Sequence, residues 1–428
     1  MILGIFLFLS GIYNWSWARD PQESTEYGAR VRFSTESYMD RLSSRVEERY
    51  GEIMSIRGKA AIVGFYEIPT QKEYPDRTTF GVMAEVARGA IADAGLRKED
   101  IDGLINGEGV NSITVAEALG IEPKYTASMT THGSSGATAI ATAAAVISAG
   151  LANYILCVFG EARPRSSSRM VGQAQARGNL PPASRATEWE LPYGPVIAMN
   201  GWYGLIKQRH MFEYGTTQEQ FAKMVVDQRF NAADNENAVW YNQPVTQEDV
   251  LNSRFTNDPL HLLESVMPCS GAHAVIVASA DRAKSLPNDP AYILGAGGPA
   301  TSHDVIWQRD DITTTPVVHS APTAMNMAEV NMNDVDLAQF YDCYTILAMA
   351  CLEDAGLTKK GDIGPFYEST DTTYKGEFPI NTDGGQIGAG QTGGVGGGFR
   401  HVVEGTRQVM GRGGIRQASK ADICLVNG

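Results

Sequence analysis

The chain has 428 residues, of which 43% are hydrophobic and 20% are charged, so it is long enough to fold around two core-bearing units. Its formal net charge of −14 argues against non-specific nucleic-acid binding, and an anionic ligand would need a locally basic groove. The five cysteines are scattered and odd in number, without metal-ligand spacing, which suits reduced core thiols in a cytoplasmic protein.

Residues 1–53 differ in composition from the rest of the chain. An apolar stretch, Met1–Ala18, has no Lys or Arg before it and leads into a charge-rich run. It is short for a membrane span and resembles the apolar core of a signal peptide only weakly. We expect translation to begin at Met54, which opens a natural first strand, and residues 1–53 to be absent from the native protein or disordered. The alternative is a membrane or export segment.

Short apolar runs rich in β-branched residues alternate with Ala-rich helical patterns along the remaining chain. The runs Lys59–Phe65, Asn153–Phe159 and Ala272–Ser279 are apolar on both faces, as in strands that helices cover on each side. The segment Thr126–Ala162 predicts a strand, a tight turn of small residues, an Ala-rich buried helix and a second strand. This alternation predicts an α/β fold.

Two pairs of segments echo each other within the chain. Met83–Ile105 is similar to Met349–Leu357, and Ser148–Gly160 is similar to Ser419–Gly428. We infer from them that the chain contains two related halves. The alternative is that Ala-Gly helix ends recur by chance.

The two halves are expected at 54–280 and 281–428. The first contains a polar insertion at about 161–267, which is too long to be a single connection. The second ends at the strand Asp422–Val426, whereas the first half continues to a further strand, so we expect the last strand of the second half to be missing from the sequence. The start of the insertion carries five arginines among small residues: Arg163, Arg165, Arg169, Arg177 and Arg185.

Several motifs agree in order and spacing with one known family. They begin with Thr126–Ala162 and continue through Tyr193-Gly194, Arg209–Thr217, Asn231–Ala238, Pro268–Ser279, Asp334–Leu357 and Asn381–Gly394. From Arg57 onward the chain resembles the thiolases, especially the sterol-carrier-protein-x type. This resemblance implies the thiolase fold, in which duplicated βαβαβ halves form a five-layered α-β-α-β-α arrangement. It also implies that the insertion covers coenzyme A and that its arginines contact the phosphates; the alternative is a solvated lid.

The chain departs from the thiolases at each catalytic position. A thiolase needs a cysteine that carries the acyl group, a histidine that activates it and a second proton-transfer group. Here Gly133 occupies the nucleophile position, Tyr341 replaces the histidine of the His-Asp-Cys-Phe motif, and Gln391 replaces that of the Gly-His-Pro motif. A glycine cannot be acylated, and neither a phenol with a pKa of about 10 nor an amide activates a cysteine in the usual way. Ordinary thiolysis is therefore excluded.

The residues that would polarise a thioester are retained. Gly133 and Ser134 stand at the start of the Ala-rich helix, where amide N–H groups and the helix dipole favour an oxyanion. Asn381, Gly384 and Gly385 keep a loop of small residues that lets the backbone approach a ligand. Such a site can stabilise a thioester enolate without an acyl-enzyme.

This pattern points to aldol or retro-aldol chemistry. The chain is similar to steroid side-chain aldolases, which are thiolase-like proteins that lack the cysteine and carry tyrosine where Tyr341 stands. The resemblance implies Tyr341 as the proton-transfer residue, with His132 and Tyr344 as further candidates. Those aldolases have a second tyrosine near the position of Gln391, so the glutamine is a departure. Tyr341 could instead be a buried tyrosine that satisfies a carbonyl, and His132 could simply fill the turn.

Two functions remain open. The first is an enzyme that cleaves or forms carbon-carbon bonds in acyl-CoA thioesters, in lipid or steroid side-chain metabolism. The second is a degenerate thiolase that serves as an acyl-CoA-binding or structural subunit. We expect coenzyme A only as part of the substrate, no tightly bound cofactor or metal, a homodimer, a small OB-fold partner protein, and no nucleic-acid or membrane partner.

Overall fold

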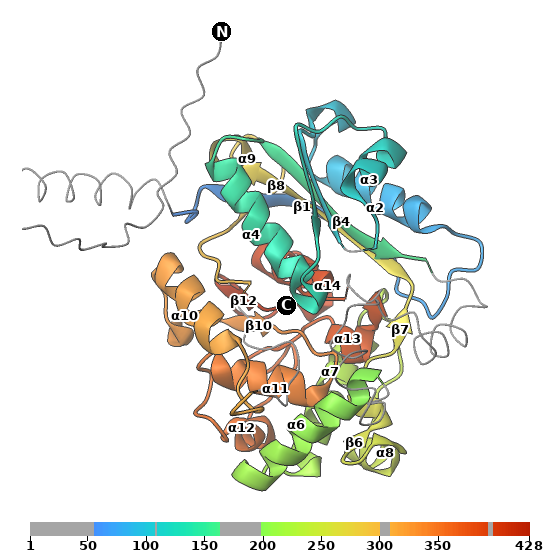
Figure 1. Ribbon diagram of the computed structural model, residues 1–428, viewed down its shortest axis with the longest axis vertical. Helices are drawn as coiled ribbons and strands as arrows, with labels where there is room; N and C mark the ends of the chain where they lie inside the picture. Colours follow the sequence, from blue (N-terminus) through green and yellow to red (C-terminus); the bar gives the residue numbers. More distant parts are fainter. Residues whose placement is uncertain (1–54, 108, 163–197, 300–308, 393–396) are drawn as a thin grey trace, which may run out of the picture. The chain divides into compact units, whose positions relative to one another are not determined.

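A six-stranded mixed sheet forms the centre of the first half of the chain (Figure 1). Its strand order is β3-β2-β4-β8-β1-β9, with β2 parallel to β3 and β4, and with β8 antiparallel to β4 and β1. The strands are β1 (Ala60–Glu67), β2 (Gly103–Gly107), β3 (Tyr125–Met129), β4 (Tyr154–Glu161), β8 (Gly271–Ser279) and β9 (Ala291–Tyr292). This computed structural model describes residues 55–107, 109–162, 198–299, 309–392 and 397–428, which belong to one compact unit.

Helices cover both faces of this sheet because its central strands are apolar on both sides. Every residue of β8 except Ser279 is buried. Helices α2 and α3 pack on one face, and α4 and α14 pack on the other. α2 begins where the Thr78 hydroxyl oxygen accepts the N–H of Gly81 at 3.1 Å. The bounds are α2 (Thr79–Asp93), α3 (Ser112–Leu119), α4 (Ser135–Ser148) and α14 (Phe399–Val409).

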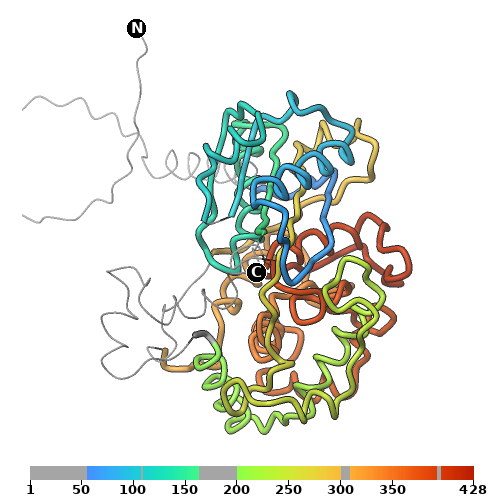
Figure 2. Tube along the Cα trace, turned by 90° about the vertical axis from the view of Figure 1, so that its right-hand side faces the viewer, coloured from blue at the N-terminus to red at the C-terminus, as the bar shows by residue number. Residues whose placement is uncertain are grey.

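The second half adds a parallel strand pair, β10 with β12, and its own helices. α14 lies between this pair and the six-stranded sheet and contacts both. α10 and α11 share a buried core with β10. The layers therefore follow the predicted α-β-α-β-α order, and Figure 2 shows residues 55–162 of the first half in blue and teal beside the second half in orange and red. The bounds are α9 (Ala280–Ala283), α10 (Val317–Ala328), β10 (Leu337–Gln339), α11 (Thr345–Asp354), α12 (Ile363–Ser369), α13 (Gly385–Ala389) and β12 (Cys424–Val426).

Only one of the two internal echoes marks equivalent positions. β12 lies parallel to β10 as β4 lies parallel to β2, which matches the second echo. The first echo paired Met83–Ile105 with Met349–Leu357 and was wrong, because α10 precedes β10 as α2 precedes β2, whereas α11 follows it. What α2 and α11 share is an ending in which Gly95 (φ 68°) or Gly356 (φ 90°) takes a left-handed backbone. That echo is a common helix end.

The predicted insertion is described from Ala198 onward. Lys207 and Glu264 form a fully buried ion pair within it, with 2.6 Å between Nζ and Oε1. The hydroxyl of Thr345, at the start of α11, donates to the same carboxylate at 2.7 Å and so ties the insertion to the second half. The elements are α6 (Ala198–Tyr214), α7 (Gln218–Ala233), α8 (Gln247–Asn252), β5 (Phe255–Asn257), β6 (Leu260–His261), β7 (Pro268–Cys269) and its partner β11 (Gln391–Thr392). The five predicted phosphate-binding arginines lie outside the described residues: Arg163, Arg165, Arg169, Arg177 and Arg185.

Candidate active site

The loop between β3 and α4 makes a tight 3₁₀ turn over His132–Ser134. Its first residue, His132, has a left-handed backbone with φ of 49°, which is uncommon for a residue other than glycine. The N–H of Ser134 donates to the carbonyl of Thr131 at 3.1 Å, and its hydroxyl donates to the same carbonyl at 2.7 Å. The sequence predicts Ser134 as an oxyanion-binding residue, but its backbone amide already donates to an acceptor within the turn.

Gly133 is the point at which the side chain of Tyr341 reaches this loop. A Cβ atom at Gly133 would lie 2.4 Å from Cζ and 2.7 Å from Oη of Tyr341. Real Cβ atoms do not approach other atoms so closely, because van der Waals contact between carbons needs about 3.5–4.0 Å. The phenol ring thus occupies the space into which a nucleophilic side chain at position 133 would project. The substitutions at these two positions are sterically linked.

Tyr341 is a buried phenol whose hydroxyl meets the side chain of Gln391. The residue comes shortly after the end of β10 in the sequence. Its Oη accepts a hydrogen bond from Nε2 of Gln391 at 3.4 Å. Burial raises the pKa of Tyr341 well above its ordinary value, and the neighbouring Cys343 and Asp342 act in the same direction. The phenol is therefore held in its protonated form, in which it can donate a hydrogen bond or a proton.

The carboxylate of Asp342 fixes the backbone next to Tyr341. It accepts the N–H of Gln386 at 2.8 Å and that of Ile387 at 3.1 Å, both at the start of α13. Its Oδ1 also lies 3.2 Å from Nε2 of His401, and both side chains are fully buried. The His401 ring centroid is 6.3 Å from that of Tyr341. This carboxylate and imidazole form a rigid support behind the phenol.

Asn381 and Gly385, which the sequence predicts as substrate-binding residues, lie in the same support. The Asn381 amide accepts the N–H of Phe340 at 2.7 Å and donates to the carbonyl of Phe340 at 2.9 Å. A Cβ at Gly385 would lie 2.3 Å from Oδ2 of Asp342. Both residues therefore position the strand end that carries Tyr341. Contact with substrate stays a prediction for them.

Tyr344 packs against the aromatic ring of Tyr203 in α6. Its hydroxyl donates to Oδ1 of Asn200 at 2.5 Å, and its ring stacks on Tyr203 with 4.4 Å between centroids. Burial raises the pKa of Tyr344 as well. The structure thus brings Gly133, Tyr341 and Gln391 together, and it places Tyr344 in a packed position beside α6.

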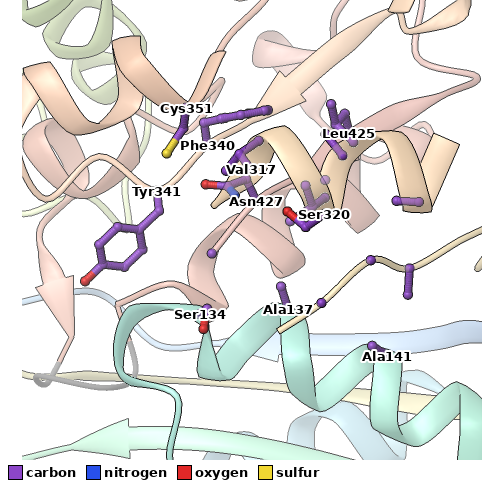
Figure 3. Close-up of a pocket in the computed structure, with 18 of the residues that line it drawn as sticks. Ser134, Ala137, Ala141, Val317, Ser320, Phe340, Tyr341, Cys351, Leu425 and Asn427 are labelled. Atoms are coloured by element: carbon purple, nitrogen blue, oxygen red, sulfur yellow. The ribbon is translucent and has the colours of Figure 1, made fainter. Parts of the chain in front are cut away.

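A cavity of about 670 Å³ begins at the 3₁₀ turn. His132, Ser134 and Tyr341 line one end of it, together with Tyr203 from α6, and we call this the catalytic end. Figure 3 shows Ser134 at the start of α4 and the Tyr341 ring close to it, with α10 across the cavity. A thioester that enters the catalytic end would meet the phenol and the helix start together.

The opposite end of the cavity lies where, by comparison with the first half, a strand equivalent to β8 would stand. It is lined by β9 and the residues after it as far as 298, which lie against α10, and by residues 422–428 around β12. In the six-stranded sheet, β8 fills the place between β4 and β1. The described residues put no strand between β12 and the 291–298 segment. We therefore regard the catalytic end, and not this gap between strands, as the part of the cavity that serves chemistry.

The hydrogen bond from Gln391 to Tyr341 gives a first prediction. Replacing Gln391 by leucine removes a bond with a net free energy of about 0.5–1.5 kcal/mol, so we expect kcat to fall by about two- to tenfold. Gln247→Leu is the matched control, because the Gln247 amide donates to the Glu219 carbonyl at an exposed site. Steady-state rates of the two variants make the comparison. Equal rates in both would show that Gln391 does not set the position of the phenol.

Sequence reasoning missed three residues of the site. Asp342 stands beside Tyr341 in the same motif, so adjacency could have indicated it. His401 and Tyr203 lie in α14 and α6, and no spacing in the sequence relates them to Tyr341. Only the packing of α14 on β10 and of α6 on α11 brings them to the site.

In residues 55–107, 109–162, 198–299, 309–392 and 397–428, no three His, Cys, Asp or Glu side chains are grouped so that they could hold a metal ion. Over the same ranges, no helix has both the length and the apolar character needed to cross a bilayer.

Known proteins are similar to this chain in both sequence and fold. Residues 298–428 match the family of thiolase C-terminal domain-like proteins. The chain is 33% identical over 364 residues to a steroid side-chain-cleaving aldolase from Thermomonospora curvata, covering 83% of this chain and 91% of the aldolase. It is 30% identical over 359 residues to an acetyl-CoA acetyltransferase from Methanothermobacter thermautotrophicus, covering 81% and 90%. The solved structure of an Ltp2-ChsH2(DUF35) aldolase superposes with a TM-score of 0.75 at 29% identity, covering 86% of this chain and 93% of that one.

Proposed function

The chain belongs to the thiolase superfamily, and from this membership we propose that it cleaves β-hydroxyacyl-CoA thioesters by a retro-aldol reaction. It is an enzyme of the superfamily's aldolase type, related to the sterol-carrier-protein-x members. The observation that supports the proposal most directly is the phenol of Tyr341 in the space beside Gly133. A protonated acid stands where an acyl-cysteine would form.

The reaction needs two proton transfers and no covalent intermediate with the protein. A base takes the proton of the β-hydroxyl, and the oxygen becomes the carbonyl of a released ketone or aldehyde. The Cα–Cβ bond breaks, and its electron pair becomes the thioester enolate. An acid then delivers a proton to Cα, which leaves a shortened acyl-CoA.

We assign the acid to Tyr341, because burial holds its phenol in the protonated form. His132 is the candidate base, since it lines the catalytic end of the cavity and an imidazole can accept a proton near neutral pH. After each turnover the proton passes from the imidazolium back to the tyrosinate through solvent. Gly133 contributes by leaving room for the ring, and Gln391 by holding its hydroxyl.

A deuterium-incorporation experiment tests the proposal. We expect β-hydroxyacyl-CoA thioesters in D₂O to give a ketone or aldehyde and an acyl-CoA that carries one deuterium at Cα, as measured by mass spectrometry. With β-ketoacyl-CoA and free coenzyme A we expect no thiolysis, because position 133 offers no nucleophile. Thiolysis at a rate typical of enzymes would contradict the proposal. Binding of acyl-CoA without turnover of either substrate class would favour the non-catalytic subunit.

The assembly in which this reaction takes place is also part of the proposal. The similar aldolase structure is a complex with a DUF35 protein, and we propose that a small partner of that kind completes the acyl-CoA site here. We further propose a homodimer formed through β3, which is the edge strand of the six-stranded sheet and keeps partly exposed side chains. The substrate would come from lipid or steroid side-chain breakdown in the cytoplasm. Mass photometry with and without the partner measures both associations.

A further inference from the structure

Arg309 lines the same cavity as Tyr341 and Tyr203. One of its nitrogens, Nη1, donates to the carbonyl of Thr314 at 3.0 Å. Its Nε is buried and meets no hydrogen-bond acceptor. Among the described residues, none of the ion pairs within 4.0 Å includes this guanidinium. The arginine therefore brings an unpaired positive charge to the wall of the cavity.

The carboxylates near Arg309 are already occupied by other groups. Asp311 accepts the N–H of Thr313 at 2.8 Å and the hydroxyl of Thr314 at 2.5 Å. Asp354 is paired with Lys360 at 3.1 Å and accepts the backbone N–H of Thr315. Neither carboxylate forms an ion pair with the guanidinium within 4.0 Å. The protein thus leaves this charge to be met by something that enters the cavity.

The surroundings of Arg309 make such a charge costly on its own. Arg309 is half-buried, and the cavity that it lines also has apolar side chains in its wall, among them Ile206, Val317 and Leu347. Burial raises the pKa of the Cys351 thiol to about 12, and the positive charge of Arg309 acts in the opposite direction. Figure 3 shows Cys351 on the same side of the cavity as Tyr341. A buried donor without an acceptor is destabilising, and a planar guanidinium matches carboxylate and phosphate groups.

We propose that Arg309 binds an anionic group of the substrate, a carboxylate or a phosphate, from the wall of the cavity that Tyr341 also lines. The inference rests on the proposed function in one respect, namely that the substrate is an acyl thioester. A carboxylate would belong to the acyl part, and a phosphate to coenzyme A. The site would then select substrates by charge while Tyr341 acts on the thioester.

Binding measurements separate the two sources of the anion. We would titrate the wild type and Arg309→Gln with 3-hydroxyglutaryl and 3-hydroxyvaleryl thioesters, each as the coenzyme A ester and as the N-acetylcysteamine ester. If Arg309 binds a carboxylate, the variant should lose about ten- to hundredfold in affinity for both glutaryl esters only. If it binds a phosphate, the variant should lose a similar factor for both coenzyme A esters only.

Controls keep this test independent of folding and of turnover. Arg309→Lys retains the charge and should keep part of the affinity, and Arg254→Gln removes an exposed arginine outside the cavity and should change nothing. Thermal melting checks each variant. Equal affinity of the wild type and Arg309→Gln for all four esters would overturn the role of Arg309, even if retro-aldol turnover is found. Failure of the wild type to bind any of the four would overturn this inference and the proposed function together.

Discussion

Replacing Tyr341 by phenylalanine is expected to lower kcat for retro-aldol cleavage by about 10²–10⁴-fold, the range that a positioned acid contributes. The change removes only the hydroxyl, so the ring still fills the space beside Gly133 and the fold should be kept. KM should change little, because the loss falls on the proton-transfer step. Single-turnover assays with a β-hydroxyacyl-CoA measure the effect.

Tyr241→Phe is the matched control for this experiment, since Tyr241 is 39% exposed and lies outside the cavity. The pH dependence adds a second readout. Because burial holds the pKa of Tyr341 well above its ordinary value of 10.0, the phenol stays protonated at neutral and mildly alkaline pH. We therefore expect no loss of rate from ionisation of Tyr341 below about pH 9. Full activity of Tyr341→Phe would remove the acid role.

Replacing Gly133 by alanine is expected to disturb both stability and activity. The new Cβ would lie 2.4 Å from Cζ of Tyr341, and the ring is buried and cannot swing into solvent. Such overpacking costs about 1–3 kcal/mol of unfolding free energy, and moving the hydroxyl by about 1 Å can cost about 10²-fold in rate. Urea unfolding and kcat measure the two effects. Gly133→Cys should behave similarly and should not gain thiolysis.

Two comparisons test the steric cause. Gly89→Ala also brings a Cβ against a tyrosine, at 2.2 Å from Tyr66, but that ring is 41% exposed and can move away, so little destabilisation is expected. In the double variant Gly133→Ala with Tyr341→Ala, the added methyl enters vacated space. The two changes should then be less than additive by at least about 1 kcal/mol. Additive effects would show that the contact between these positions does not limit the fold.

The periodicity of the sequence was sufficient to predict the layers of strands and helices. It was not sufficient to predict which elements of the two halves are equivalent. Two-sided apolar runs predicted β1, β4 and β8 because strands buried on both faces cannot alternate polar and apolar residues. The Ala-rich stretch predicted α4, and the structure starts this helix at Ser135. The echo of α2 in α11 misled because a glycine at a helix end satisfies the same local geometry wherever a helix stops.

Local sequence motifs predicted individual residues of the candidate site but not the contacts between them. Tyr341 and Gln391 were chosen from separate motifs, and the structure joins them by a hydrogen bond. Asn381 was chosen as a substrate contact, yet its amide is hydrogen-bonded to the backbone of Phe340. A side chain that serves the backbone and one that serves a ligand have the same letter in a sequence. Their hydrogen-bond partners distinguish them.

The sequence by itself determined that this chain is an α/β protein and that Gly133 cannot carry an acyl group, because periodicity and residue chemistry are local properties. Only the tertiary structure decided what fills the place of the absent side chain. The ring of Tyr341 lies there because β10 and the start of α4 meet across the two halves of the chain. Likewise, only the structure shows that Arg309 lines the cavity and that its Nε is buried without an acceptor, because a sequence does not give the surroundings of a side chain.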